Sequence, residues 1–249
     1  MSFQLQALTS SVAVPCYYKH FKFLPDLLHS LTKQTILPEK VVISLSQVEN
    51  LKKEDVDNLE AGPWPFQVDI IRREGVFMEG ANRTTAVLHC DSDIVLCIDA
   101  DDIPHPQRIE AVLQLFEALP NAQMVLCGHA YTPNDSIICE RSIPIVSADE
   151  FMNMTFELGS HTWLQIHHIK DLQNWPTGVH NGSPSLRRSV MDGGYCWTNI
   201  KNGADLEFNH SILRAGHDAY LLKVPLLHYY NGRSSGADIG RENKDYKAK

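Results

Sequence analysis

The chain has 249 residues, with 22 lysines and arginines against 30 aspartates and glutamates, and a formal net charge of −8. A hydrophobic fraction of 43% and a charged fraction of 21% are typical of a folded globular protein and exclude a disordered or collagen-like chain. The acidic balance argues against a nucleic-acid-binding protein, which usually carries a basic face.

The ends and the cysteines indicate a cytoplasmic protein. The first residues lack the basic start and apolar run of a signal peptide, and no stretch reaches the roughly 18 apolar residues of a membrane-spanning helix. Four cysteines lie in or beside apolar runs, namely Cys16, Cys90, Cys97 and Cys127. We therefore expect buried free thiols in a reducing compartment, and no transmembrane segment.

Short apolar runs alternate with helical patterns through the first half of the chain. The patterns predict strands over residues 11–16, 41–45, 67–71, 94–98 and 123–127, and helices over 21–34, 51–59, 80–90 and 106–119. This alternation predicts an α/β fold, a doubly wound and mostly parallel sheet with helices on both faces. Ligands of such sheets bind beyond the carboxyl ends of the strands.

The second half is less regular. A capping box, Ser147 with Glu150, predicts a helix over 147–155, and further helices are predicted over 189–193 and 204–215, the last closed by Gly216. A strand is predicted over 220–224, and the Gly-, Ser- and charge-rich residues 233–249 are expected to be a mobile tail. Because no stretch within residues 1–232 has the composition of a linker, these residues are expected to form one domain.

Three carboxylates cluster directly after the continuously apolar run at 94–98: Asp99, Asp101 and Asp102. Packing anions together costs free energy unless a cation binds them, and carboxylate oxygens suit Mg²⁺ or Mn²⁺. A divalent ion there would attract a diphosphate, so an acidic protein could still bind an anionic substrate. A solvated acidic turn before the helix at 106–119 is the alternative.

An apolar strand that ends in Asp-x-Asp also occurs in haloacid-dehalogenase-type phosphatases, in which the first aspartate is the nucleophile. Asp99 would take that role here. Those enzymes usually carry Thr or Val where this chain has Ile103, and their motif lies near the chain start. This remains a second hypothesis.

Five short patches follow one another along the chain. They read VAVPCYYK with LPDLLHSLTKQT over 12–35, GANR over 80–83, DADD over 99–102, GADLE with LRAG over 203–216, and PLLH over 225–228. In this order they resemble the family 2 glycosyltransferases, which have the GT-A fold. The resemblance implies a metal-dependent inverting transfer of a sugar from a nucleotide-sugar donor to an acceptor hydroxyl, on a glycan, a lipid-linked or a protein acceptor.

The resemblance also implies roles for particular residues. It makes Asp205 the catalytic base, places the donor against Pro15, Tyr17, Arg83 and Asp99, and gives Mn²⁺ or Mg²⁺ the ligands Asp101, Asp102 and His228. Residues 1–130 would then form the donor half and 131–232 the acceptor half. Each residue has a plainer alternative: a helix-terminal charge for Asp205, a surface position for Arg83 and a structural role for His228.

The chain departs from the family at the end of the second strand. The family usually has Asp-Asp-Gly there, and one of these acids reads the nucleobase, whereas this chain has Ser44, Leu45, Ser46 and Gln47. The nucleobase therefore stays unassigned. The departure also leaves a third hypothesis, a non-catalytic module that binds nucleotide sugars or glycans.

Overall fold

The computed structural model describes residues 7–131, 146–156, 166–173, 175–176, 179–200 and 202–229. The strands are β1 (Ser10–Tyr17), β2 (Lys40–Ser46), β3 (Gln67–Arg73), β4 (Ile94–Cys97), β5 (Ile103–Pro104), β6 (Ala122–Tyr131), β7 (Ile166–Ile169), β8 (Ser185–Arg187) and β9 (Asp218–Tyr229). The α-helices are α1 (Leu24–Leu31), α2 (Lys53–Glu60), α3 (Glu79–Leu88), α4 (Arg108–Ala118), α5 (Ala148–Asn153), α6 (Arg188–Asp192) and α7 (Ala204–Arg214), with short 3₁₀ helices η1 (Tyr18–Phe23) and η2 (Val48–Asn50).

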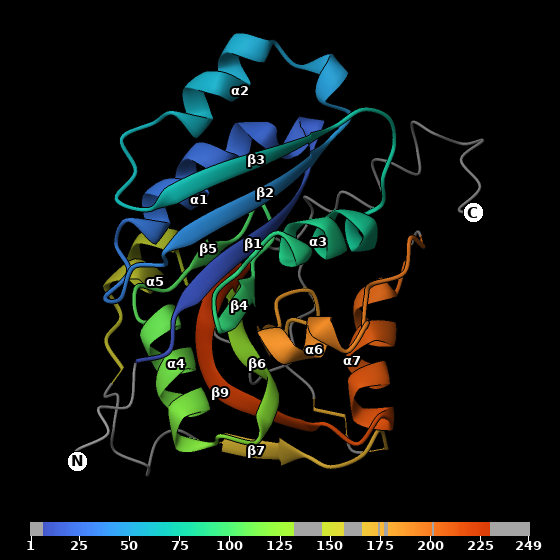
Figure 1. The fold of residues 1–249 in the computed structure, drawn as a ribbon. Coiled ribbons are helices and arrows are strands. Elements are labelled where there is room, and N and C mark those ends of the chain that lie inside the picture. Colours follow the sequence, from blue (N-terminus) through green and yellow to red (C-terminus); the bar gives the residue numbers. More distant parts are fainter. Residues whose placement is uncertain are drawn as a thin grey trace, which may run out of the picture.

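The described strands join in one mixed sheet in the order β3-β2-β1-β4-β8-β6-β9-β5, and β7 pairs with β9 (Figure 1). The long pairings β3–β2, β2–β1, β1–β4 and β6–β9 are parallel, which confirms a mostly parallel sheet. The short strand β8 runs antiparallel between β4 and β6. Consequently β1, β2, β4 and β6 share one carboxyl edge, and the chain enters β8 from that edge.

Alternation along the central strands separates two cores. Val12, Val14 and Leu96 face α1 and α4, whereas Ala13 and Cys97 face α3, α6 and α7 on the other side of the sheet (Figure 1). Since both faces are covered, β4 is wholly apolar and β1 is apolar except for Ser10 and Ser11. Each cysteine that the structure describes is free, and Cys16, Cys90, Cys97 and Cys127 are buried as expected.

Most predicted elements are confirmed, although several differ in length; the strand predicted over 123–127, for example, covers Ala122–Tyr131. The helix predicted over 21–34 covers only Leu24–Leu31, because η1 precedes it and Pro25 lies in its first turn. The strand predicted over 220–224 extends to Asp218–Tyr229, and Pro225 is accommodated where the pairing with β6 shifts register. The capping box of Ser147 and Glu150 is present.

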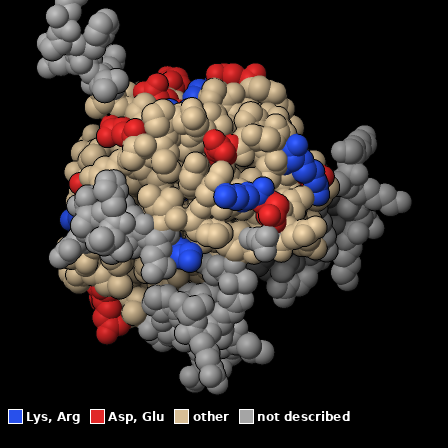
Figure 2. Space-filling model, turned by 90° about the horizontal axis from the view of Figure 1, so that it is seen from below, with Lys and Arg blue, Asp and Glu red and all other residues tan. Residues whose placement is uncertain are grey.

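The predicted tail over 233–249 lies outside the described residues. Within the described ranges, no helix combines the length and the apolarity needed to cross a lipid bilayer. On the face shown in Figure 2, acidic and basic side chains lie among uncharged ones, and no broad band of one sign covers the described surface.

Candidate active site

A cavity of about 350 Å³ opens at the carboxyl edge of the sheet. It is lined by the end of β1, the loop after β4, the ends of β6 and β9, the residues before β8 and the first turns of α3 and α7. Segments far apart in sequence therefore meet where a doubly wound sheet binds its ligands.

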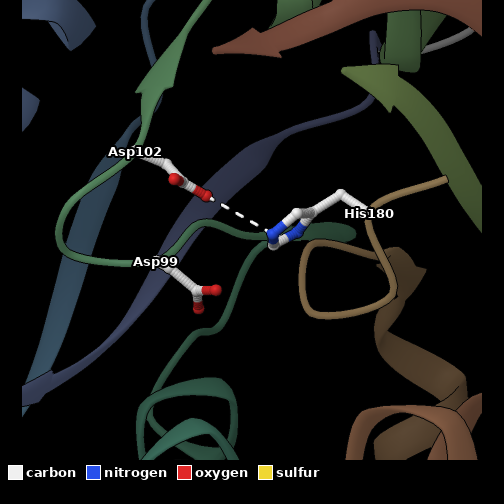
Figure 3. A group of neighbouring side chains, drawn as sticks. All are labelled: Asp99, Asp102 and His180. Carbon is white, nitrogen blue, oxygen red and sulfur yellow. Dashed lines mark ion pairs between the residues drawn. The ribbon is translucent and has the colours of Figure 1, made fainter. Parts of the chain in front are cut away.

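Asp99 and His180 line this cavity, and the buried Asp102 lies close to both (Figure 3). One ligand atom from each lies within 4.8 Å of the others, and His180 Nε2 is 3.7 Å from Asp102 Oδ2. The two aspartates come from the loop after β4. His180 comes from the segment that leads into β8, which brings the histidine to the same edge.

This group fits a divalent cation. Burial lowers the pKa of His180 well below its ordinary value, with His129, Arg83 and Arg108 acting in the same direction, so the imidazole is neutral and able to bind a metal. Burial also raises the pKa of Asp99, and Glu79, Asp205 and Asp101 add to that shift against the opposing effect of Arg83. A cation would offset this crowding of carboxylates.

Of the three predicted metal ligands, Asp102 is the one that lies in this group. Asp101 lines the cavity beside it, with Oδ1 3.7 Å from His20 Nδ1. The imidazole of His228 is fully buried, with Nε2 2.9 Å from the carbonyl oxygen of Val146 and its ring against Phe151. The structure thus brings His180, which was not among the predicted ligands, close to Asp99 and Asp102, whereas His228 is outside this group.

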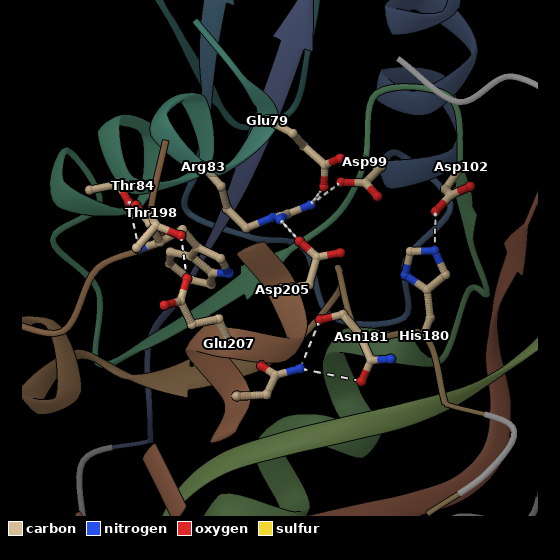
Figure 4. A network of polar contacts seen from close by, with 12 residues as sticks. Glu79, Arg83, Thr84, Asp99, Asp102, His180, Asn181, Thr198, Asp205 and Glu207 are labelled. Carbon is tan, nitrogen blue, oxygen red and sulfur yellow. Dashed lines mark hydrogen bonds and ion pairs between the residues drawn. The ribbon is translucent and has the colours of Figure 1, made fainter. Parts of the chain in front are cut away.

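Arg83 binds carboxylates from three elements (Figure 4). Its Nη1 donates to Asp205 Oδ1 at 2.7 Å, and its Nη2 donates to Asp99 Oδ1 at 2.6 Å and also to Glu79. The side chain is fully buried. Burial opposes its charge, but the three carboxylates outweigh that effect and raise the pKa of the guanidinium well above its ordinary value.

Asp205 reaches the cavity from the first turn of α7. Gly203 precedes the helix with φ +82°, a left-handed conformation that turns the chain into α7. The Asp205 side chain remains 30% exposed and lines the cavity together with Asp99. Near the helix N-terminus its negative charge is favoured. The carboxylate is therefore accessible to a substrate bound in the cavity.

Pro15 and Tyr17, predicted to contact the donor, also line the cavity. Beside them, the amide of Asn82 on α3 is bonded to the end of β2: its Nδ2 donates to Ser46 Oγ at 2.9 Å, and its Oδ1 accepts from Ser44 Oγ at 3.2 Å. Neutral, mutually bonded groups thus occupy the strand end where the family usually has acids.

The sheet and its cavity define an α/β protein of the GT-A type. Residues 11–187 match the family described as Glycosyl transferase family 2, and the chain belongs to this family. The match does not support the phosphatase hypothesis, and Asp99, its supposed nucleophile, is held by Arg83.

Two bacterial glycosyltransferases are similar to this chain in sequence, with different identities and coverage. An uncharacterized glycosyltransferase of Haemophilus influenzae is 32% identical over 115 residues, which cover 46% of this chain and 37% of that protein. The uncharacterized glycosyltransferase YwdF of Bacillus subtilis is 23% identical over 234 residues, which cover 92% of this chain and 78% of that protein.

Solved structures of S. aureus TarS share the fold. The complex of TarS residues 1–349 with UDP has a TM-score of 0.63 at 13% identity, and the match covers 90% of this chain and 60% of that one. The complex with UDP-GlcNAc has a TM-score of 0.65 at 12% identity, covering 93% and 61%. The chain thus spans about three-fifths of the TarS chains and a little over a third of the Haemophilus protein.

Proposed function

We propose that this chain is a metal-dependent, inverting glycosyltransferase that moves a sugar from a nucleotide-sugar donor to an acceptor hydroxyl. One observation carries the proposal: the carboxylate of Asp205 lines the same cavity as Asp99 and His180, which form a group with the buried Asp102, and Arg83 is bonded to both Asp99 and Asp205. A base and a cation site are thus close enough to act on one substrate.

Asp99, Asp102 and His180 would hold the Mn²⁺ or Mg²⁺, which supplies positive charge for the departing diphosphate when bound. Asp205 accepts the proton of the acceptor hydroxyl while that oxygen attacks the anomeric carbon. The attack comes from the face opposite the leaving diphosphate and inverts the configuration of that carbon. Pro15 and Tyr17 bound the donor side of the cavity.

The donor half comprises residues 1–130 and the acceptor half residues 131–232 in this proposal. The TarS neighbours are complexes with UDP and UDP-GlcNAc, which makes uridine diphosphate sugars the first donors to test. The acceptor is a hydroxyl of a glycan, a lipid-linked molecule or a protein.

The test is release of nucleoside diphosphate from a panel of nucleotide sugars with Mn²⁺, with water or simple sugars as acceptors. We expect turnover of at least one donor, loss of turnover in EDTA, and a loss of about 10²- to 10⁴-fold in the Asp205→Asn variant. Asp192→Asn is the matched control, since this exposed carboxylate pairs with Arg188 away from the cavity.

Binding of nucleotide sugars without turnover of any donor would favour the non-catalytic module. Turnover that resists EDTA would contradict the metal dependence, and full activity of Asp205→Asn would remove Asp205 as the base.

A further inference from the structure

We propose that Arg83 is a positioning residue, whose planar guanidinium sets the place of the base Asp205 relative to the donor-side residue Asp99. This role rests on the proposed function. It differs from a direct contact between Arg83 and the donor diphosphate, because the Arg83 side chain is fully buried and reaches the cavity only through its carboxylate partners.

The geometry links two sides of the reaction through one rigid group. Nη1 of Arg83 lies 2.7 Å from Asp205 Oδ1, and Nη2 lies 2.6 Å from Asp99 Oδ1. The two nitrogens belong to one planar fork, which fixes the spacing of the oxygens that they bind. Asp205 lies on α7 and Asp99 after β4, so no local backbone geometry would otherwise fix their separation.

The fork itself is held on its other sides. Glu79, one helical turn before Arg83 on α3, binds the same Nη2. The guanidinium carbon lies 5.7 Å from the ring centroid of Trp197, which is stacked on Phe208 at 3.7 Å. The Trp197 amide donates to Thr84 Oγ1 at 2.9 Å, next to Arg83 in the sequence. The guanidinium is thus confined by carboxylates and an aromatic stack.

Because the confined guanidinium holds the base in place, we expect its loss to lower kcat rather than the affinity for the donor. A base that is misplaced by about 1 Å can cost roughly 10²-fold in turnover, because the reacting atoms no longer meet in line. A lysine at position 83 would keep a positive charge but would offer a single flexible point of contact instead of a fork. Charge and positioning can therefore be separated by one substitution.

The experiment compares the wild type with Arg83→Lys, using the donor that the wild type turns over best in the nucleotide-sugar panel and UDP as the binding probe, both with Mn²⁺. We expect kcat to fall about 10²-fold, with the dissociation constant of UDP changed less than threefold. Arg188→Lys is the control for loss of a structural arginine, since Arg188 binds the carbonyl oxygens of Val87 and Cys90 away from the cavity. Its kcat is expected to stay within twofold of the wild type.

Two results would overturn the role of Arg83 while leaving the proposed function intact. Wild-type kcat in Arg83→Lys would show that charge alone suffices, and a weakening of UDP binding by more than threefold would assign Arg83 to the diphosphate. If Arg83→Lys does not fold, Glu79→Gln serves instead, because it loosens the fork without removing it; a lower kcat with unchanged UDP binding is expected. No turnover of any donor by the wild type would overturn the proposed function and this role together.

Discussion

Replacing Gly182 by alanine should impair the site while sparing the fold. A Cβ atom at position 182 would lie 3.0 Å from Arg83 Nη2, 3.1 Å from Asp99 Oδ2 and 3.3 Å from His180 Cε1. All three neighbours belong to the candidate site, and each would have to move by a few tenths of an ångström. Gly182 is not among the glycines with positive φ, so alanine can adopt its backbone conformation.

The expected magnitudes follow from these contacts. Alanine restricts the unfolded chain, which stabilises by about 0.4–1 kcal/mol and offsets part of the crowding, so the free energy of unfolding should change by less than about 1 kcal/mol. A displacement of about 1 Å costs roughly 10²-fold in turnover, and a shift of a few tenths should therefore cost roughly tenfold. Mn²⁺ binding should weaken as well, because Asp99 and His180 are both displaced.

Turnover of the best donor and urea unfolding measure the two effects separately. Gly216→Ala is the control with the opposite profile. Gly216 follows α7 at φ +81°, and an added Cβ would have no neighbour within 4 Å. Alanine there should therefore cost about 1 kcal/mol of stability, through backbone strain alone, and leave turnover unchanged. Wild-type turnover in Gly182→Ala would refute the claim that Arg83, Asp99 and His180 act through their exact spacing.

Two further predictions concern stability. In Gly80→Ala the new Cβ would lie 2.3 Å from the carbonyl oxygen of Thr198. Urea unfolding should therefore show a loss of about 1–3 kcal/mol in the free energy of unfolding, although alanine is the better helix former. Leu88 is exposed on the same helix, and Leu88→Ala, as the control, should change the free energy of unfolding by less than about 0.5 kcal/mol. Burial lowers the pKa of His105, whose Nδ1 accepts from the Gln107 amide, so the folded state binds this proton less readily than the unfolded chain. The contribution of His105 to the free energy of unfolding should be constant above about pH 6.5 and should fall as the pH is lowered, by at most about 1.4 kcal/mol per pH unit. The fall should be less steep in His105→Asn. An equal slope in that variant would contradict the assignment.

The parts of the fold that the sequence predicts are those governed by local pattern. The apolar run of β4 is covered on both faces and is recognisable without any knowledge of its neighbours. The same holds for α7, whose apolar positions and closing Gly216 lie within one segment. Strands β5, β7 and β8 have two to four residues each and form by pairing with distant strands. They are too short to show the alternation of apolar and polar residues from which a strand is predicted.

The residues of the candidate site likewise fall into those that local sequence pattern predicts and those that depend on distant contacts. Asp99 and Asp102 follow a recognisable strand, and their place at the carboxyl edge was predictable. His180 was not, because its position depends on β8 pairing between β4 and β6, a contact between distant parts of the chain. The ion pairs of Arg83 with Asp205 and Asp99, separated by 122 and 16 residues, likewise required the three-dimensional structure.

The central claim is that this cavity binds a nucleoside diphosphate through a divalent cation held by Asp99, Asp102 and His180. Calorimetric titration of UDP into the protein, with Mn²⁺ and then with EDTA, tests it most directly. We predict one UDP site per chain that requires Mn²⁺ and is lost in Asp102→Asn, while Asp192→Asn binds as the wild type does. UDP affinity that is the same in EDTA, or unchanged in Asp102→Asn, would contradict the claim.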